Sequence, residues 1–156
     1  MLVVLVHHAQ AVGPDVDHMR PLSAEGRRQA DRVAAALAAR GVAPAVVWHS
    51  GKLRARQTAE ACWRALNPFA AYAAARGLQP SDAPEAVATA LLAEDRDVLI
   101  AGHLPNLPRL LRRLVTGHDD GGMEEFPAHG AVALERRGDR WTVVWEITKS
   151  GDLVIL

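Results

Sequence analysis

Three short runs of consecutive apolar residues stand out along the chain. They cover residues 2–6, 45–48 and 97–101, the last of which opens with the charged Asp97, and β-branched side chains are frequent in them. A short run that is apolar at every position is typical of a strand buried on both faces, as in a parallel sheet covered by helices. We therefore predict three central strands at these segments.

Helical periodicity separates the three runs. Residues 23–40 place Ala30, Val33 and Leu37 on one face and end before Gly41, which predicts a helix. A second helix is predicted over residues 52–66, with Ser50 as its N-cap. Further helices are predicted over residues 84–93 and from residue 104 to Gly117, whereas residues 69–81 carry no clear pattern.

The period of the pattern changes near the C-terminal end. Apolar residues alternate at 132/134 and at 141/143/145/147 around Gly138-Asp139, which predicts an antiparallel hairpin, and residues 153–156 are expected to add a short strand. The predicted fold class is therefore α/β. We expect one domain over residues 1–156, with a mainly parallel central sheet flanked by helices and a C-terminal antiparallel hairpin.

Composition and charge limit the possible partners. The chain has 156 residues with 18 basic and 18 acidic side chains, so it lacks the excess charge that holds nucleic acid or an anionic membrane non-specifically. We expect neither as a partner, and any phosphate recognition must be local. Cys62 is the only cysteine, which excludes an internal disulfide and fits a cytoplasmic protein. The apolar residues 2–6 lack a positive flank, so we do not interpret them as a signal peptide.

Polar side chains follow all three predicted strands. His7-His8 ends the first, His49-Ser50 and then Arg54 follow the second, and Gly102-His103 ends the third. Because carboxyl ends of parallel strands meet at one edge of a sheet, these groups are expected to gather there. A nucleophilic imidazole, a second imidazole and a guanidinium beside helix N-termini would suit a bound anion.

Four segments, in order, resemble the motifs of the histidine phosphatase superfamily, which is also called phosphoglycerate mutase-like. Residues 5–9 stand where the family has a first strand ending in Arg-His-Gly or Arg-His-Ala, and residues 20–26 resemble its Arg-Pro-Leu-Ser/Thr segment with a following Gly. Residues 50–59 are similar to Ser-Pro-x-x-Arg-Ala-x-x-Thr-Ala without the proline, and residues 102–105 match Gly/Ser-His-x-Pro. The short length resembles the small bacterial phosphohistidine phosphatases more than the larger sugar-phosphate mutases.

The resemblance implies a role for each matching residue. His8 is implied as the nucleophile that takes the phosphoryl group, and His103 and Arg54 as catalytic residues that hold its oxygens. The implied substrate-binding residues are His7, Arg20 and Ser50. No metal and no other cofactor is expected. The implied partner is a phosphorylated small molecule or a phosphohistidine-bearing protein.

Two departures from the family pattern bear on activity. His7 replaces the family's arginine, so a permanently charged bidentate group gives way to a shorter one. No carboxylate stands in clear register as a general acid; Asp82 and Glu85 are the nearest candidates, and we interpret both as loop or helix-start carboxylates. A missing acid favours substrates with good leaving groups, such as phosphohistidine or phosphoramidates.

Two alternative interpretations stay open. Loss of the arginine could leave a phosphate- or phosphoprotein-binding module without useful turnover. Alternatively His7, His8 and His103 could hold a catalytic zinc ion, although adjacent residues on a strand are expected to point to opposite faces. Turnover of an aryl phosphate, with and without a chelator, separates all three interpretations.

Overall fold

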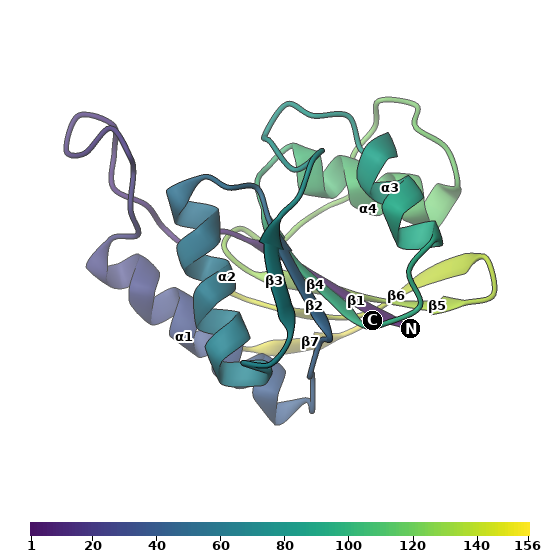
Figure 1. Ribbon diagram of the computed structural model, residues 1–156, viewed down its shortest axis with the longest axis horizontal. Coiled ribbons are helices and arrows are strands. Elements are labelled where there is room, and N and C mark those ends of the chain that lie inside the picture. Colours follow the sequence, from purple (N-terminus) through teal and green to yellow (C-terminus); the bar gives the residue numbers. More distant parts are fainter.

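The computed structural model describes residues 1–156 and contains one seven-stranded sheet with the strand order β3-β2-β4-β1-β5-β6-β7 (Figure 1). The strands are β1 (Leu2–His7), β2 (Val46–His49), β3 (Ala71–Ala74), β4 (Val98–Gly102), β5 (Ala131–Arg137), β6 (Arg140–Ile147) and β7 (Leu153–Ile155). The pairs β3-β2, β2-β4 and β4-β1 are parallel, whereas β1-β5, β5-β6 and β6-β7 are antiparallel. The α/β class and the hairpin are confirmed, and the sheet is mixed because β5 pairs directly with β1.

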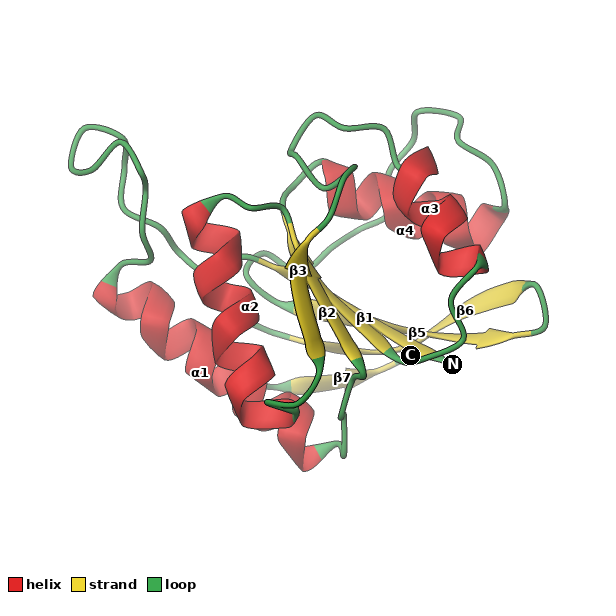
Figure 2. Ribbon diagram, viewed as in Figure 1, coloured by secondary structure: helices red, strands yellow, loops and turns green.

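The helices cover both faces of the sheet (Figure 2). They are α1 (Ala24–Ala39), α2 (Leu53–Leu66), α3 (Glu85–Leu92) and α4 (Asn106–Thr116). In β1, Val3 and Leu5 belong to the core under α3 and α4, whereas Val4 and Val6 belong to the core under α1 and α2. This two-sided burial explains why the strand is apolar at every position. No helix combines the length and the apolar character that crossing a membrane requires.

Two details of the sequence prediction are wrong or incomplete. The sequence pattern does not predict strand β3, because Ala-Tyr-Ala-Ala has little β-propensity; the strand forms through backbone pairing with β2. Ser50 is not the N-cap of α2, which begins at Leu53 with Lys52 in the cap position and no side-chain cap bond. The Ser50 hydroxyl group contacts His103, and it also accepts a hydrogen bond from the backbone N–H of Lys52 at 3.3 Å.

Candidate active site

The candidate site lies at the carboxyl ends of β1 and β4. These strands are parallel neighbours with His7 opposite Gly102, so the residues that follow them emerge side by side. The backbone N–H of His8 donates to the carbonyl of Gly102 at 3.0 Å. As a result, the His8 and His103 ring centroids are 5.1 Å apart.

The hydrogen bond at the His8 ring determines which nitrogen is free. Its Nδ1 lies 2.7 Å from the carbonyl oxygen of Ala9, which can only accept, so Nδ1 carries the proton and Nε2 has the lone pair. The pKa of His8 is lowered to about 4. Burial is the main cause and the charge of Arg54 adds to it, whereas the hydrogen bond with Ala9 raises the pKa. His8 is therefore neutral at pH 7 with an unprotonated Nε2.

Contacts from α1 and α2 fix the backbone that follows His8. The N–H of Ala9 donates to Oγ1 of Thr58 at 3.0 Å, and that hydroxyl group donates to the carbonyl of Arg54 at 2.8 Å. A Cβ at Gly26 would overlap the carbonyl oxygen of Gln10, so only glycine allows α1 to approach this closely. The helical pattern alone predicts only core packing for Thr58, although this residue lies in the third motif.

His103 and Arg54 bring polar groups with unused hydrogen-bonding capacity. Nε2 of His103 lies 2.6 Å from Oγ of Ser50, and its Nδ1 is buried without a partner. Burial, then His8 and Arg54, lower the pKa of His103 to about 3. Nε of Arg54 is also buried without a partner, and desolvation followed by the charge of Arg20 lowers the pKa of Arg54. A buried guanidinium donor without an acceptor favours an anionic ligand.

Arg20 lies on the loop that joins β1 to α1, and this loop projects from the molecule (Figure 1). A β-bridge between Ala11 and Leu22 closes the base of this loop, and Nε of Arg20 donates to the carbonyl of Val12 at 3.1 Å. Its charge contributes to the lowered pKa values of His8, His103 and Arg54. The structure thus gathers all six sequence-predicted site residues in one region: His7, His8, Arg20, Ser50, Arg54 and His103.

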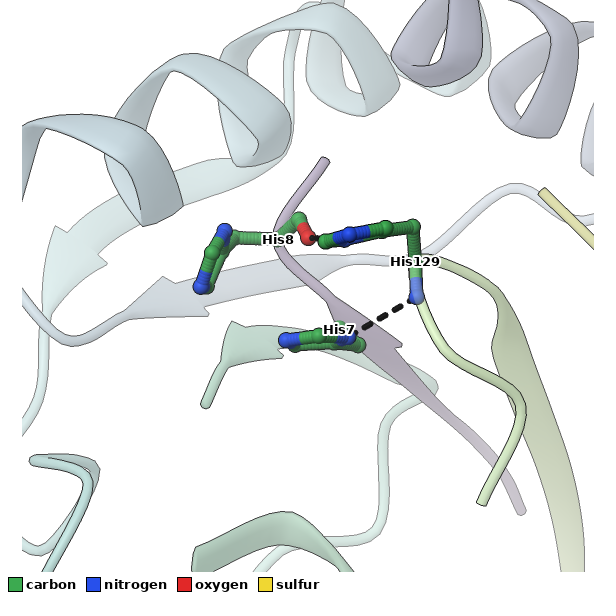
Figure 3. Close-up of side chains that lie close together, drawn as sticks. All are labelled: His7, His8 and His129. Atoms are coloured by element: carbon green, nitrogen blue, oxygen red, sulfur yellow. Dashed lines mark hydrogen bonds between the residues drawn. The ribbon is translucent and has the colours of Figure 1, made fainter. Parts of the chain in front are cut away.

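His129 is a further site residue that sequence reasoning missed. Its backbone N–H donates to Nδ1 of His7 at 2.8 Å, and its own Nδ1 donates to the carbonyl of His8 at 2.7 Å (Figure 3). The rings of His7 and His129 stack with centroids 4.7 Å apart and planes 9° from parallel. The only signal in the sequence is the position of His129, two residues before a strand that flanks β1.

The expectation that His7 and His8 point to opposite faces is wrong. Strand β1 ends at His7, so the alternation of side chains along a strand does not extend to His8. The two rings meet edge to face with centroids 4.6 Å apart. Burial, followed by His8 and His129, lowers the pKa of His7 to about 3.

The histidine cluster does not fit a zinc ion in its present arrangement. The residues with metal-like spacing are His7, His8 and His129, not the expected set with His103, and their ligand atoms lie within 4.8 Å of one another. The hydrogen bond at His7 argues against a metal ion. Nδ1 of His7 already accepts a backbone hydrogen bond, so its Nε2 carries the proton that a metal would have to displace.

The two candidate acids have structural partners outside the histidine cluster. Glu85 forms an ion pair with Arg113 at 3.0 Å, which links α3 to α4 and lowers the pKa of Glu85. The carboxylate of Asp82 accepts from the backbone N–H of Gln79 at 2.9 Å within its own loop. Neither carboxylate forms a hydrogen bond with a histidine of the site.

Known proteins share part of this sequence and the overall fold. Residues 4–79 match the family described as the histidine phosphatase superfamily (branch 1). The protein histidine phosphatase SixA, solved in complex with tungstate, has a TM-score of 0.84 and 24% identity over 96% of this chain and 97% of its own. A protein assigned as a SixA phosphohistidine phosphatase from Nakamurella multipartitia has a TM-score of 0.68 and 26% identity over 85% of this chain and 83% of its own.

A more distant relative extends the comparison. A mycobacterial glucosyl-3-phosphoglycerate phosphatase, solved with VO3, has a TM-score of 0.69 and 16% identity over 91% of this chain and 96% of its own. No curated protein sequence matches the chain significantly. The shared architecture therefore includes phosphatases whose names state quite different substrates.

Proposed function

We propose that the chain, whose residues 4–79 match the histidine phosphatase superfamily, is a phosphatase that acts through a phosphohistidine intermediate at His8. Its substrate is a phosphohistidine-bearing protein or a small phosphomonoester. The reaction needs no metal and no other cofactor. The reducing cytoplasm, which the single buried Cys62 fits, is the proposed compartment.

The observation that carries the proposal is the hydrogen bond from Nδ1 of His8 to the carbonyl of Ala9. It directs the lone pair to Nε2, and burial keeps the ring neutral at pH 7, so no proton has to leave before attack. Arg54 and His103 supply polar groups beside this ring, and Nε of Arg54 has no protein acceptor. Phosphoryl transfer asks mainly for an in-line nucleophile and for donors around the phosphoryl oxygens.

The reaction proceeds in two successive displacements at phosphorus. The Nε2 lone pair of His8 forms a bond to phosphorus, and the bond to the leaving group breaks with its electron pair going to that group. The phosphorylated ring keeps its Nδ1 proton, so positive charge develops on the ring and is stabilised by the carbonyl of Ala9. Water then attacks phosphorus, the bond to Nε2 breaks, and phosphate leaves with His8 restored.

The absence of a positioned acid favours one class of substrate. With Glu85 paired to Arg113 and Asp82 bonded to the Gln79 backbone, the leaving group must depart with little protonation from a carboxylic acid. The imidazole of phosphohistidine and the amines of other phosphoramidates meet this requirement better than an alkoxide. We therefore place N-phosphorylated proteins before alkyl phosphomonoesters among the substrates.

A specific observation also supports a second function. His7 stands where the family motif has arginine and is held neutral, so the site has less positive charge than the family pattern implies. A pocket weakened in this way could bind phosphate or a phosphoprotein without useful turnover. The same residues would then form a recognition module.

Kinetics of two histidine variants separate these functions. We expect His8→Asn to reduce turnover of an aryl phosphate and of a phosphohistidine peptide at least ~1,000-fold, because the nucleophile is lost. The control is His118→Asn, which changes an exposed histidine outside the site and is expected to keep full activity. A chelator should leave wild-type turnover unchanged. Wild-type protein that binds tungstate but turns over neither substrate would support the binding module instead.

A further inference from the structure

Three contacts connect His129 to the two histidines that end β1. Its backbone N–H donates to Nδ1 of His7, its ring Nδ1 donates to the carbonyl of His8, and its ring stacks on that of His7 (Figure 3). His129 adopts a left-handed backbone conformation with φ of +55°, which is unusual for a residue other than glycine. Such strain persists where the surroundings hold it in place.

The hydrogen bond from the His129 backbone determines which nitrogen of the His7 ring carries the proton. A backbone N–H can only donate, so Nδ1 of His7 must accept and cannot carry a proton. A neutral His7 therefore holds its proton on Nε2. That nitrogen points away from the His129 backbone, toward the side on which the His8 ring lies (Figure 3).

We propose that His129 is a positioning residue that holds His7 in the uncharged Nε2–H form, as a neutral hydrogen-bond donor to the phosphoryl group. The inference rests on the proposed function for the identity of the ligand, but the ring form itself does not depend on turnover. The hydrogen bond from the His129 ring to the His8 carbonyl anchors the residue. Its backbone N–H then faces Nδ1 of His7.

The surroundings of His7 reinforce this form. The groups that lower its pKa, after burial, are His8 beside it, His129 before β5, His103 after β4 and Arg54 on α2. No carboxylate is among them, so none of these groups favours the charged ring. In a protonated His7 ring, Nδ1–H would also point at the backbone N–H of His129, and two donors would face each other. The cationic side chains whose charges act on the site histidines are Arg54, Arg20 and Lys52.

Two substitutions at the same position test the anchor. His129→Gly removes the ring and its hydrogen bond but suits the left-handed backbone. His129→Asn also tolerates that backbone, and its side-chain amide can donate to the His8 carbonyl. The proposal predicts that glycine releases His7 and that asparagine restores its form.

The measurement is the ¹⁵N chemical shift of both His7 ring nitrogens in the full chain, assigned with a His7→Asn variant, with tungstate affinity measured in parallel. Wild type and His129→Asn should show the Nε2–H form from pH 6 to 8, whereas His129→Gly should show mixed forms. Tungstate binding to His129→Gly should weaken about 2- to 12-fold at pH 8, since one neutral hydrogen bond is affected, and should become pH-dependent.

Three results would overturn the proposal. The first is a wild-type His7 that is charged or carries its proton on Nδ1 at pH 7. The second is a His129→Gly variant with unchanged His7 shifts. The third is a His129→Asn variant that behaves like the glycine variant, since the hydrogen bond to His8 would then not be the anchor. The shifts do not require turnover, so an inactive protein with the predicted shifts would contradict only the proposed function.

Discussion

The rings of His8 and His103 lie with centroids 5.1 Å apart and planes tilted by 56°, because β1 and β4 are parallel neighbours. Nδ1 of His8 is occupied by the Ala9 carbonyl, and Nε2 of His103 contacts Ser50. Each ring therefore has one nitrogen engaged by the protein and one left over. This relationship is the basis of the phosphoryl-transfer geometry proposed for the chain.

The Arg54→Ala variant tests the guanidinium. We expect tungstate affinity and kcat/KM on an aryl phosphate each to fall about 10- to 100-fold, because charge-assisted hydrogen bonds are worth about 1.5–3 kcal/mol. The control is Arg64→Ala, which removes an exposed arginine of the same helix, paired only with Glu60, and should leave both quantities unchanged. Equal effects of the two variants would mean that Arg54 acts only through general charge.

His7→Arg should restore the contact that the family motif implies. A permanent charge and a bidentate contact, realised mainly in the transition state, would raise kcat/KM about 10- to 100-fold. The measurement is steady-state turnover of an aryl phosphate at pH 8, with tungstate binding as the check on folding. An arginine variant that binds tungstate but is no faster than wild type would show that position 7 does not contact the substrate phosphate as the motif arginine does.

The pH dependence of activity follows from the lowered pKa values of the histidines. His8 must be neutral to attack, and its pKa is about 4. The value of kcat/KM should therefore fall only as the pH decreases toward 4. His7, with a pKa of about 3, is uncharged from pH 5 upward and should cause no decline between pH 6 and 8. A wild-type profile that drops between pH 6 and 8, together with a flat profile for the His7→Arg variant, would show instead that a charged His7 contributes.

The same histidines should make the fold sensitive to mild acid. The pKa values of His7 and His8 in the folded protein lie below the unfolded value of about 6.5. At mildly acidic pH the unfolded chain therefore binds more protons than the folded protein. Stability is therefore complete above pH 6.5 and falls as the pH decreases toward 4. His7 and His8 together should remove roughly 2–3 kcal/mol of unfolding free energy per pH unit between 6 and 5.

Urea unfolding followed by tryptophan fluorescence at several pH values measures this slope. Carboxylates such as Glu25 and Glu94 also have lowered pKa values, but their ordinary pKa of about 4.5 confines most of their effect to pH values below about 5. A double variant, His7→Asn with His8→Asn, should remove roughly two thirds of the histidine slope and leave the part due to His103, whose pKa is also lowered to about 3, whereas His118→Asn should leave the slope unchanged. An unchanged slope in the double variant would contradict neutral burial of these two rings.

The sequence is informative where a local pattern encodes the structure. Apolar runs bounded by histidine locate β1, β2 and β4 to within about one residue, and the alternation near Gly138 locates the hairpin. Parallel pairing then explains why His8 and His103 meet. The edge strand β3 escapes prediction because alanine gives it no pattern, and its existence depends on pairing with β2.

The contacts around His129 could not be predicted in this way. They depend on the antiparallel pairing of β1 with β5, which brings together residues from opposite ends of the chain. His129 belongs to none of the four motifs, so no local signal links it to His7. Thr58 is visible within a motif, but its hydrogen bond to Ala9 depends on how α2 docks against the end of β1.

The most direct test of the account is the site and isomer of phosphate trapped on the protein. Rapid quenching of wild type during turnover of a phosphohistidine peptide should yield acid-labile, base-stable phosphate on His8. Because Nδ1 of His8 is hydrogen-bonded to the Ala9 carbonyl, mass spectrometry and isomer-specific antibodies should find the phosphoryl group on Nε2. Phosphate on Nδ1 of His8, on another residue, or absent from a protein that turns over at the same rate would contradict the account.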